Sequence, residues 1–178
     1  MAKNSVKQIE EDEKKILREL VNNSNKSINE IANKCSFSRQ KVWRIIKNLE
    51  RNHTIWGYTT IVNEEKQDMK SYTILIKRNN QPMKKEPINK IVKREIEQTA
   101  EKINVHIDNS LYVHGLYDWL IYINAPNTKE AKKFTEALTN MYSGIISDIQ
   151  LLETLFTVKK NGITNPEIEN LRDFFNGI

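Results

Sequence analysis

SINEIANKCSFSRQKVWRIIKNL, residues 27–49, decides the fold of the first part of the chain. Ser27 precedes an apolar run and Glu30 follows three residues later, which is the capping-box pattern of a helix N-terminus. The helix predicted for residues 28–34 ends at the turn Cys-Ser-Phe, and Ser38 caps a further helix that runs to about Asn52. Two short helices joined by a tight turn predict a helix-turn-helix.

The hydrophobic pattern on either side of this stretch extends the prediction to a complete domain. Residues 11–22 carry apolar side chains at helical spacing and predict a first helix. In the third helix the apolar residues recur on one face, at Val42, Ile45, Ile46 and Leu49. The β-branched and aromatic run TIWGYTTIV, residues 54–62, then predicts a strand. Three helices followed by a strand indicate a winged helix-turn-helix.

The excess of positive over negative charge is concentrated in and around the third helix. The net charge is +5, and residues 33–51 contain six basic residues and one acid. Opposite the apolar face, a single stripe contains Gln40, Arg44, Lys47 and Arg51. Such a stripe is either a solvated surface or a surface for a polyanion. Like charges four residues apart destabilise a helix, and a capped helix and turn precede it, so we favour insertion into the major groove of DNA.

The side chains of this helix suit different parts of a duplex. Arg44 and Gln40 have the donor patterns that read guanine and adenine, respectively, whereas Lys47 and Arg51 suit phosphates. Ser38 and the free amides at the helix start also suit a phosphate, and Trp43 either contacts a thymine methyl or sugar or packs against the wing. The predicted DNA-contacting residues are Ser38, Arg39, Gln40, Lys41, Trp43, Arg44, Lys47 and Arg51.

The second part of the chain alternates strand and helix patterns in the order β-α-β-β-α-β, which is typical of a ferredoxin-like domain. The predicted elements are a strand at 71–78, a helix from Pro87 to about 102, two strands around a turn at 114–117, a helix after Pro126 and a last strand at 147–160. The fold class is therefore α+β, with a winged helix-turn-helix in residues 1–66, a ferredoxin-like effector and oligomerisation domain in 67–160, and a tail in 161–178 with a short helix after Pro166.

Over residues 12–160 the chain resembles the leucine-responsive/asparagine-synthase regulator (Lrp/AsnC) family of transcription factors. The resemblance lies in DEKKILRELVNNSNKSINEIANKC, SRQKVWRIIKNLE and IWGY, and in the hairpin HGLYDWLIYI. It implies dimers formed through the second domain's sheet, further assembly into octamers, palindromic double-stranded DNA sites, and amino-acid effectors bound near the hairpin. Gly115, Tyr117 and Asp118 match the family's hairpin motif and are the implied effector residues. A plain turn in which Gly115 supplies a positive φ remains an equal alternative.

Other patterns bear on the alternatives. Ile45 stands where the family often has an arginine, which implies one phosphate contact fewer.

The chain also resembles the siroheme decarboxylases, which have the same two-domain layout. An enzyme of that kind is therefore an alternative, as is a sensor or adaptor that does not bind DNA. The chain shows no zinc-protease, phosphate-loop or nucleophile-elbow motif, and we predict no catalytic residue, cofactor or metal. No apolar run approaches the ~18 residues of a membrane span, and the N-terminus lacks a signal-peptide core, so we expect a cytoplasmic protein.

Overall fold

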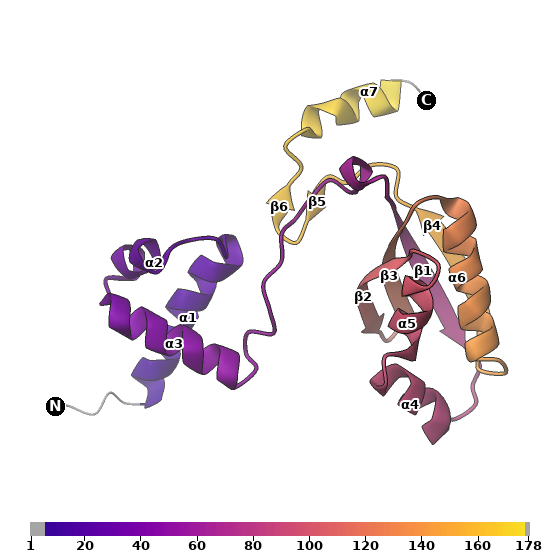
Figure 1. Ribbon diagram of the computed structural model, residues 1–178, viewed down its shortest axis with the longest axis horizontal. Coiled ribbons are helices and arrows are strands. Elements are labelled where there is room, and N and C mark those ends of the chain that lie inside the picture. Colours follow the sequence, from indigo (N-terminus) through magenta and orange to yellow (C-terminus); the bar gives the residue numbers. More distant parts are fainter. Residues whose placement is uncertain (1–5, 177–178) are drawn as a thin grey trace. The chain divides into compact units, whose positions relative to one another are not determined.

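The computed structural model describes residues 6–176, and the chain divides into two compact units, one ending at Ile61 and the other beginning at Val62 (Figure 1). The first unit is helical and the second contains a four-stranded antiparallel sheet with helices. Each unit has a hydrophobic core of its own. The predicted α+β class is confirmed.

The first unit consists of α1 (Val6–Asn22), α2 (Ile28–Cys35) and α3 (Arg39–Arg51). In α1 and α3 the buried residues recur every three or four positions and form one stripe that faces the core, whereas the short α2 buries the adjacent Ile31 and Ala32. The buried residues that form this core are Ile16, Leu20, Ile31, Ala32, Val42, Ile45 and Leu49. A core this small leaves the unit dependent on each of its members.

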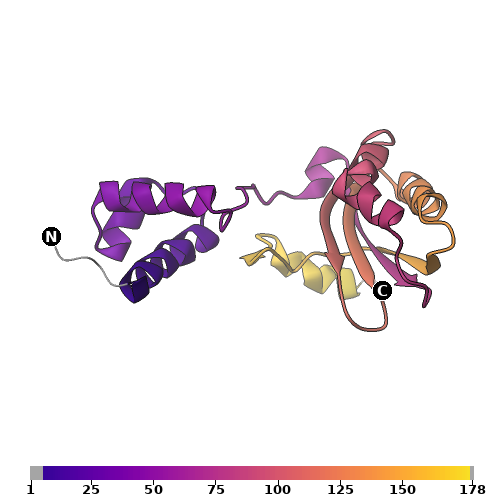
Figure 2. The same ribbon diagram turned by 90° about the horizontal axis from the view of Figure 1, so that it is seen from below.

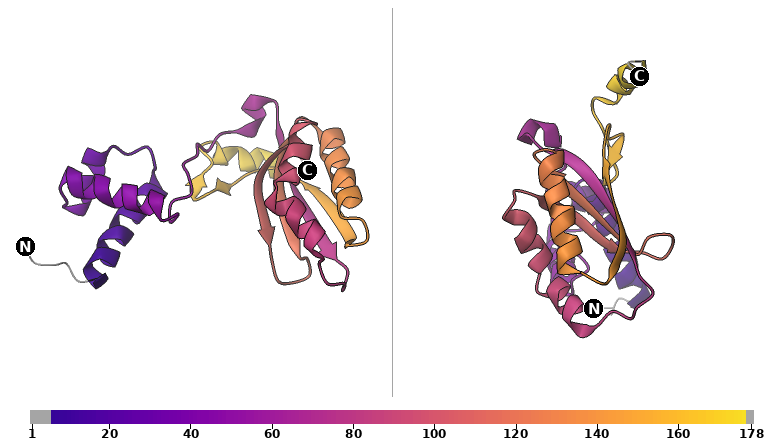
Figure 3. Two further views of the ribbon diagram at one scale, coloured as in Figure 1. Left: turned by 60° about the horizontal axis from the view of Figure 1, so that its bottom comes forward. Right: turned by 90° about the vertical axis from the view of Figure 1, so that its right-hand side faces the viewer.

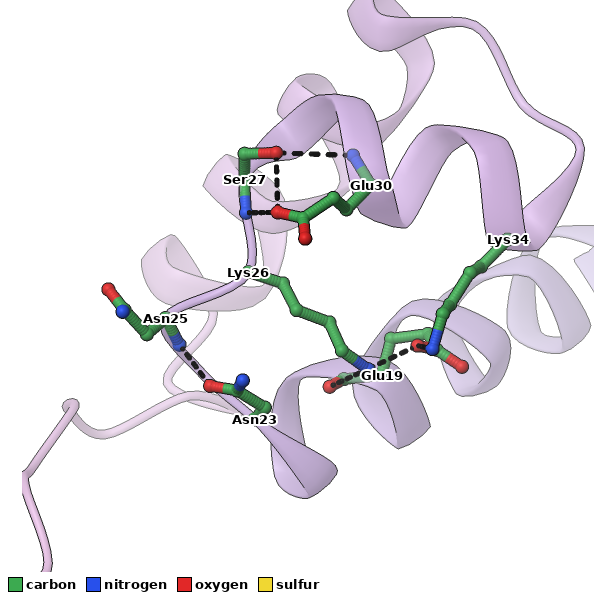
Figure 4. Close-up of polar contacts among 7 residues, drawn as sticks. All are labelled: Glu19, Asn23, Asn25, Lys26, Ser27, Glu30 and Lys34. Atoms are coloured by element: carbon green, nitrogen blue, oxygen red, sulfur yellow. Dashed lines mark hydrogen bonds and ion pairs between the residues drawn. The ribbon is translucent and has the colours of Figure 1, made fainter.

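Polar contacts fix α2 against α1 (Figure 4). The hydroxyl of Ser27 accepts a hydrogen bond from the Glu30 amide at 3.2 Å, and the Glu30 carboxylate accepts one from the Ser27 amide at 2.8 Å. The carboxylate of Glu19 on α1 lies 2.6 Å from the ammonium of Lys26 and 3.6 Å from that of Lys34. Lys26 precedes α2 and Lys34 lies in its last turn, so the Glu19 carboxylate pairs with a lysine near each end of the helix.

The turn between α2 and α3 sets the start of α3. Ser36 ends α2 in the left-handed conformation, with φ of 57°, and its amide donates to the carbonyls of Ala32 and Asn33. Ser38 then takes an extended conformation, and its hydroxyl accepts from the Lys41 amide at 3.2 Å. This contact satisfies one of the free amides at the beginning of α3.

The strand predicted for residues 54–62 is wrong, because the structure contains no regular element between α3 and residue 64. Ile55 packs against the core of the first unit, and its amide donates to the Leu49 carbonyl at 3.0 Å. Trp56, the next residue, is 95% exposed. The described residues offer this segment no neighbouring strand, and a β-prone sequence without a pairing partner has no sheet to join.

The second unit is built on the sheet β2-β3-β1-β4, in which every neighbouring pair is antiparallel. The strands are β1 (Lys70–Arg78), β2 (His106–Tyr112), β3 (Trp119–Ala125) and β4 (Ile146–Glu153). The helices α5 (Glu95–Glu101) and α6 (Thr128–Met141) cover one face of the sheet (Figures 2 and 3), and α4 (Lys85–Val92) precedes α5. This is the predicted ferredoxin-like arrangement.

Side chains alternate between the two faces of the sheet, as a strand requires. On β1, Tyr72, Ile74 and Ile76 are buried under the helices, whereas Leu75 points to the open face. Phe134 and Leu138 of α6 complete the core on the covered face. The central strands therefore contribute both a packed core and an open surface.

The single helix predicted for residues 87–102 is wrong, because the structure has two helices, α4 and α5. The break lies at Arg94, whose left-handed φ of 58° cannot continue a helix. Helix α4 buries no residue, whereas α5 buries Ile96 and Ala100. The change of direction lets α5 pack on the sheet.

The last predicted strand, residues 147–160, is also interrupted, since β4 ends at Glu153. A hairpin follows, formed by β5 (Lys159–Lys160) and β6 (Ile163–Thr164), with Gly162 at a positive φ of 86°. Lys160 pairs with Glu64 of the short helix η1 (Glu64–Gln67) and with Asp108 of β2. The chain then forms η2 (Ile168–Asn170) and α7 (Leu171–Asn176).

Candidate nucleic-acid interface

The outward face of α3 carries the polar residues that the sequence placed there. Arg39, Gln40, Arg44, Lys47 and Arg51 are all exposed, while Val42, Ile45 and Leu49 are buried on the opposite side. Among the described residues, the side chains of Arg44 and Arg51 form no ion pair. Their guanidinium groups are therefore available to a partner.

Lys47 is paired, but with a surface residue. Its ammonium lies 2.7 Å from the carboxylate of Glu50, which also accepts a hydrogen bond from the Tyr58 hydroxyl at 3.1 Å. The Lys47 ammonium and then the Tyr58 hydroxyl lower the pKa of the Glu50 carboxyl below its ordinary value. An exposed pair of this kind contributes at most about 1 kcal/mol, so Lys47 can exchange Glu50 for a phosphate at small cost.

Lys41 differs from the other basic residues of α3. Its ammonium lies 2.6 Å from the carboxylate of Asp12 on α1 and 3.8 Å from the centre of the Phe37 ring. Asp12 is only 3% exposed. The hydrogen bond from Lys41 lowers the pKa of Asp12 below its ordinary value, even though burial acts in the opposite direction.

Asp12 and Phe37 were not among the residues that the sequence singled out. The available signal was the position of Asp12 on α1, where it precedes Ile16 and Leu20 at intervals of four and shares their buried stripe. An acid on an apolar stripe needs a buried cation or donor nearby. The sequence does not say which of the many lysines supplies it.

Three further residues of the interface have distinct surroundings. Ser38 caps α3, and Trp43 is 54% exposed and does not belong to the core. Ile45 is 8% exposed and packs with Leu49. Because its side chain packs in the core, Ile45 offers no group to a phosphate, and the expectation of one phosphate contact fewer stays a prediction.

The β2–β3 hairpin holds the three residues that match the effector motif. The Tyr117 hydroxyl donates to the side-chain carbonyl of Gln150 at 2.9 Å, and the Asp118 carboxylate accepts from the Arg78 amide at 2.8 Å. Asp118 thus satisfies the backbone at the end of β1, and Tyr117 reaches β4. Gly115 does not have a positive φ, so the alternative in which it is required for a left-handed turn is wrong.

Comparison with known proteins finds one family model that matches part of the first unit. Residues 13–55 match the winged helix-turn-helix DNA-binding family. The first unit therefore contains a DNA-binding domain, and α3 is its last helix. No curated protein sequence matches the chain.

Solved structures resemble nearly the whole chain in fold. An AsnC family transcriptional regulator from Agrobacterium tumefaciens is 20% identical, with a TM-score of 0.60 over 88% of this chain and 96% of that one. A transcriptional regulator from Neisseria meningitidis in complex with L-methionine is 17% identical, with a TM-score of 0.64 over 87% and 94%. A feast or famine regulatory protein from M. tuberculosis complexed with L-methionine is 13% identical, with a TM-score of 0.67 over 89% and 99%.

These structures share the two-domain layout of this chain, and at such identities the likeness establishes the fold. The described residues include no helix with both the length and the hydrophobicity needed to cross a membrane. The same residues contain no group of three or more histidine, cysteine or acidic side chains placed to hold a metal ion.

Proposed function

We propose that this chain is a transcriptional regulator of the Lrp/AsnC type that binds double-stranded DNA through α3. The observation that carries the proposal is the exposed face of Gln40, Arg44 and Arg51, presented by a helix whose other face is fixed in the core of a helix-turn-helix. A rigid helix with free donors on one side is the element that enters a major groove.

Within this proposal the side chains have separate roles. Gln40 and Arg44 read bases, and Arg39, Lys47 and Arg51 contact phosphates. Ser38 holds the start of α3 beside the backbone of the duplex, and Trp43 contacts a sugar or a thymine methyl. The DNA-binding domain comprises residues 1–66, the effector and oligomerisation domain residues 67–160, and the tail residues 161–178.

The active form that we propose is a homodimer, which can assemble further into an octamer. The open face of the sheet supports this, because no helix within residues 6–176 covers the apolar side chains that lie on it: Leu75, Leu111, Leu120, Tyr122 and Leu152. A two-fold dimer presents two copies of α3 to a palindromic operator, with half-sites about 34–36 Å apart.

We further propose an amino-acid effector at the β2–β3 hairpin, with Gly115, Tyr117 and Asp118 as its site. Two structures of the same fold contain L-methionine, which supports a ligand of this class. Such a ligand acts by binding one assembly or helix spacing better than another.

We favour a regulator over an enzyme of the siroheme decarboxylase layout and over a sensor that does not bind DNA. The basic face of α3 serves neither alternative, because tetrapyrrole chemistry and small-molecule sensing need no exposed row of cations on a helix-turn-helix. The protein then needs no catalytic residue and no cofactor, and it acts in the cytoplasm, where its DNA is.

Selection of bound fragments from a pool of random duplexes tests this function. We expect enrichment of dyad-symmetric sequences whose half-sites are separated by about 10–10.5 base pairs or a multiple. Enrichment of no sequence, with weak binding that does not depend on salt, would favour the sensor or the enzyme instead.

For the effector, thermal unfolding in the presence of each of the common amino acids is the appropriate screen. We expect at least one to raise the midpoint by several degrees, because a ligand at about a hundred times its dissociation constant stabilises by about 2.7 kcal/mol. The shift should fall in Tyr117→Phe, which removes only the hydroxyl that now contacts Gln150.

The control for this screen is Tyr58→Phe, which removes a hydroxyl that contacts Glu50 in the first unit. Asp118→Ala is a poor probe, because it also deprives the Arg78 amide of its acceptor. Equal shifts of the unfolding midpoint in wild type and Tyr117→Phe would show that Tyr117 is not part of the site. If no amino acid shifts the midpoint, the proposal of an amino-acid effector is wrong.

A further inference from the structure

We propose that Asp12 withholds Lys41 from DNA and, through it, fixes the N-terminal end of the recognition helix α3. The inference rests on the proposed function. It makes Asp12 a positioning residue and removes Lys41 from the set of phosphate contacts that α3 supplies.

The geometry around Lys41 is that of an internal counter-ion. Its ammonium lies 2.6 Å from the Asp12 carboxylate, which also accepts a hydrogen bond from the Gln8 side-chain amide at 3.1 Å. The Lys41 side chain is 28% exposed and that of Asp12 only 4%. If Lys41 moved from Asp12 to a phosphate, the buried carboxylate of Asp12 would remain in the interior without its cation, which is unfavourable.

The Phe37 ring closes the other side of the site. The ammonium of Lys41 lies 3.8 Å from the centre of this ring, and that of Lys15 lies 5.7 Å from it. An ammonium over an aromatic face is attracted to the ring. Lys41 is therefore bound by a carboxylate from α1 and by a ring from the turn before α3.

These contacts lie where α3 begins. The Lys41 amide already donates to Ser38, the first cap of the helix, and its side chain adds a link to α1. The neighbouring Gln40 and Arg44 project from the same end of the helix to the outside. By fixing the start of α3, Asp12 thus determines the direction in which the base-reading side chains Gln40 and Arg44 point.

The salt dependence of DNA binding shows whether Lys41 is withheld from the duplex. The slope of the logarithm of the binding constant against the logarithm of the salt concentration reports how many phosphates the protein neutralises, with about 0.9 for each phosphate. We would measure it on a random-sequence duplex for the wild type, Lys41→Met, Lys47→Met and Asp12→Asn. The expected slope for Lys41→Met equals that of the wild type. The expected slope for Lys47→Met is smaller in magnitude by about 0.9, and that for Asp12→Asn is larger by about 0.9, because it releases Lys41.

A Lys41→Met slope reduced as much as that of Lys47→Met, or an Asp12→Asn slope equal to that of the wild type, overturns the inference. A Lys47→Met slope that also stays unchanged counts against DNA contact by α3, and so against the proposed function. Circular dichroism reports whether each variant folds. If Asp12→Asn or Lys41→Met does not fold, the double variant Asp12→Asn/Lys41→Met is measured instead, because it leaves neither charge unpaired. The inference requires this double variant to have the wild-type slope.

Discussion

Replacing Ile16 by alanine is expected to unfold the helix-turn-helix and abolish duplex binding. Ile16 is fully buried at the centre of a core of seven buried residues. A change of this kind costs about 2–5 kcal/mol, from lost transfer energy and from the cavity that remains. A domain this small has little stability beyond that amount, so the loss of one core residue removes most of it.

Val21→Ala on the same helix is the matched control, since Val21 is 79% exposed. Its free energy of unfolding should change by no more than about 0.5 kcal/mol. Urea unfolding followed by circular dichroism, together with duplex binding at 25 °C, measures both effects. Wild-type stability and binding in Ile16→Ala would contradict the assignment of Ile16 to the core.

The sequence predicts well those features that depend on periodicity. The buried faces of α1 and α3 follow from apolar residues at helical spacing, and the alternation in SYTILIKR places Tyr72, Ile74 and Ile76 on one side of β1. The capping box at Ser27 and Glu30 is also as predicted. These features are local, so a single stretch of chain contains the information that determines them.

Features that depend on a residue or strand far away in the sequence were not predicted. The 54–62 segment has the composition of a strand, but a strand needs a neighbour to pair with, and residues 6–61 contain no other strand. Helical spacing places Lys47 in the stripe opposite the apolar face and Lys41 beside it, but it does not reveal their partners: Lys41 pairs with Asp12 and Lys47 with Glu50. Likewise, the motif that contains Asp118 does not reveal that its carboxylate satisfies the backbone of Arg78.

Arg44→Ala carries the largest expected effect on recognition. Arg44 lies on the exposed face of α3, and the structure records no ion pair for it in the described part of the chain. A guanidinium that donates two hydrogen bonds to guanine discriminates by about 1–3 kcal/mol, which corresponds to about 5- to 150-fold in affinity. The substitution leaves the buried face of α3 untouched, so the fold should persist.

Arg18→Ala provides the control, because Arg18 is an exposed arginine of α1 without an ion pair in the described structure. It should bind the selected duplex as the wild type does, apart from a small change in non-specific affinity. This control separates the loss of a particular contact from the loss of one positive charge.

The central claim, that α3 reads DNA sequence, is tested most directly by the affinity of wild type and Arg44→Ala for the selected duplex and for duplexes altered at single base pairs. We predict that the wild type discriminates at every half-site position, and that Arg44→Ala binds more weakly and loses discrimination at one position in each half-site. Equal discrimination by both proteins at all positions would contradict the claim.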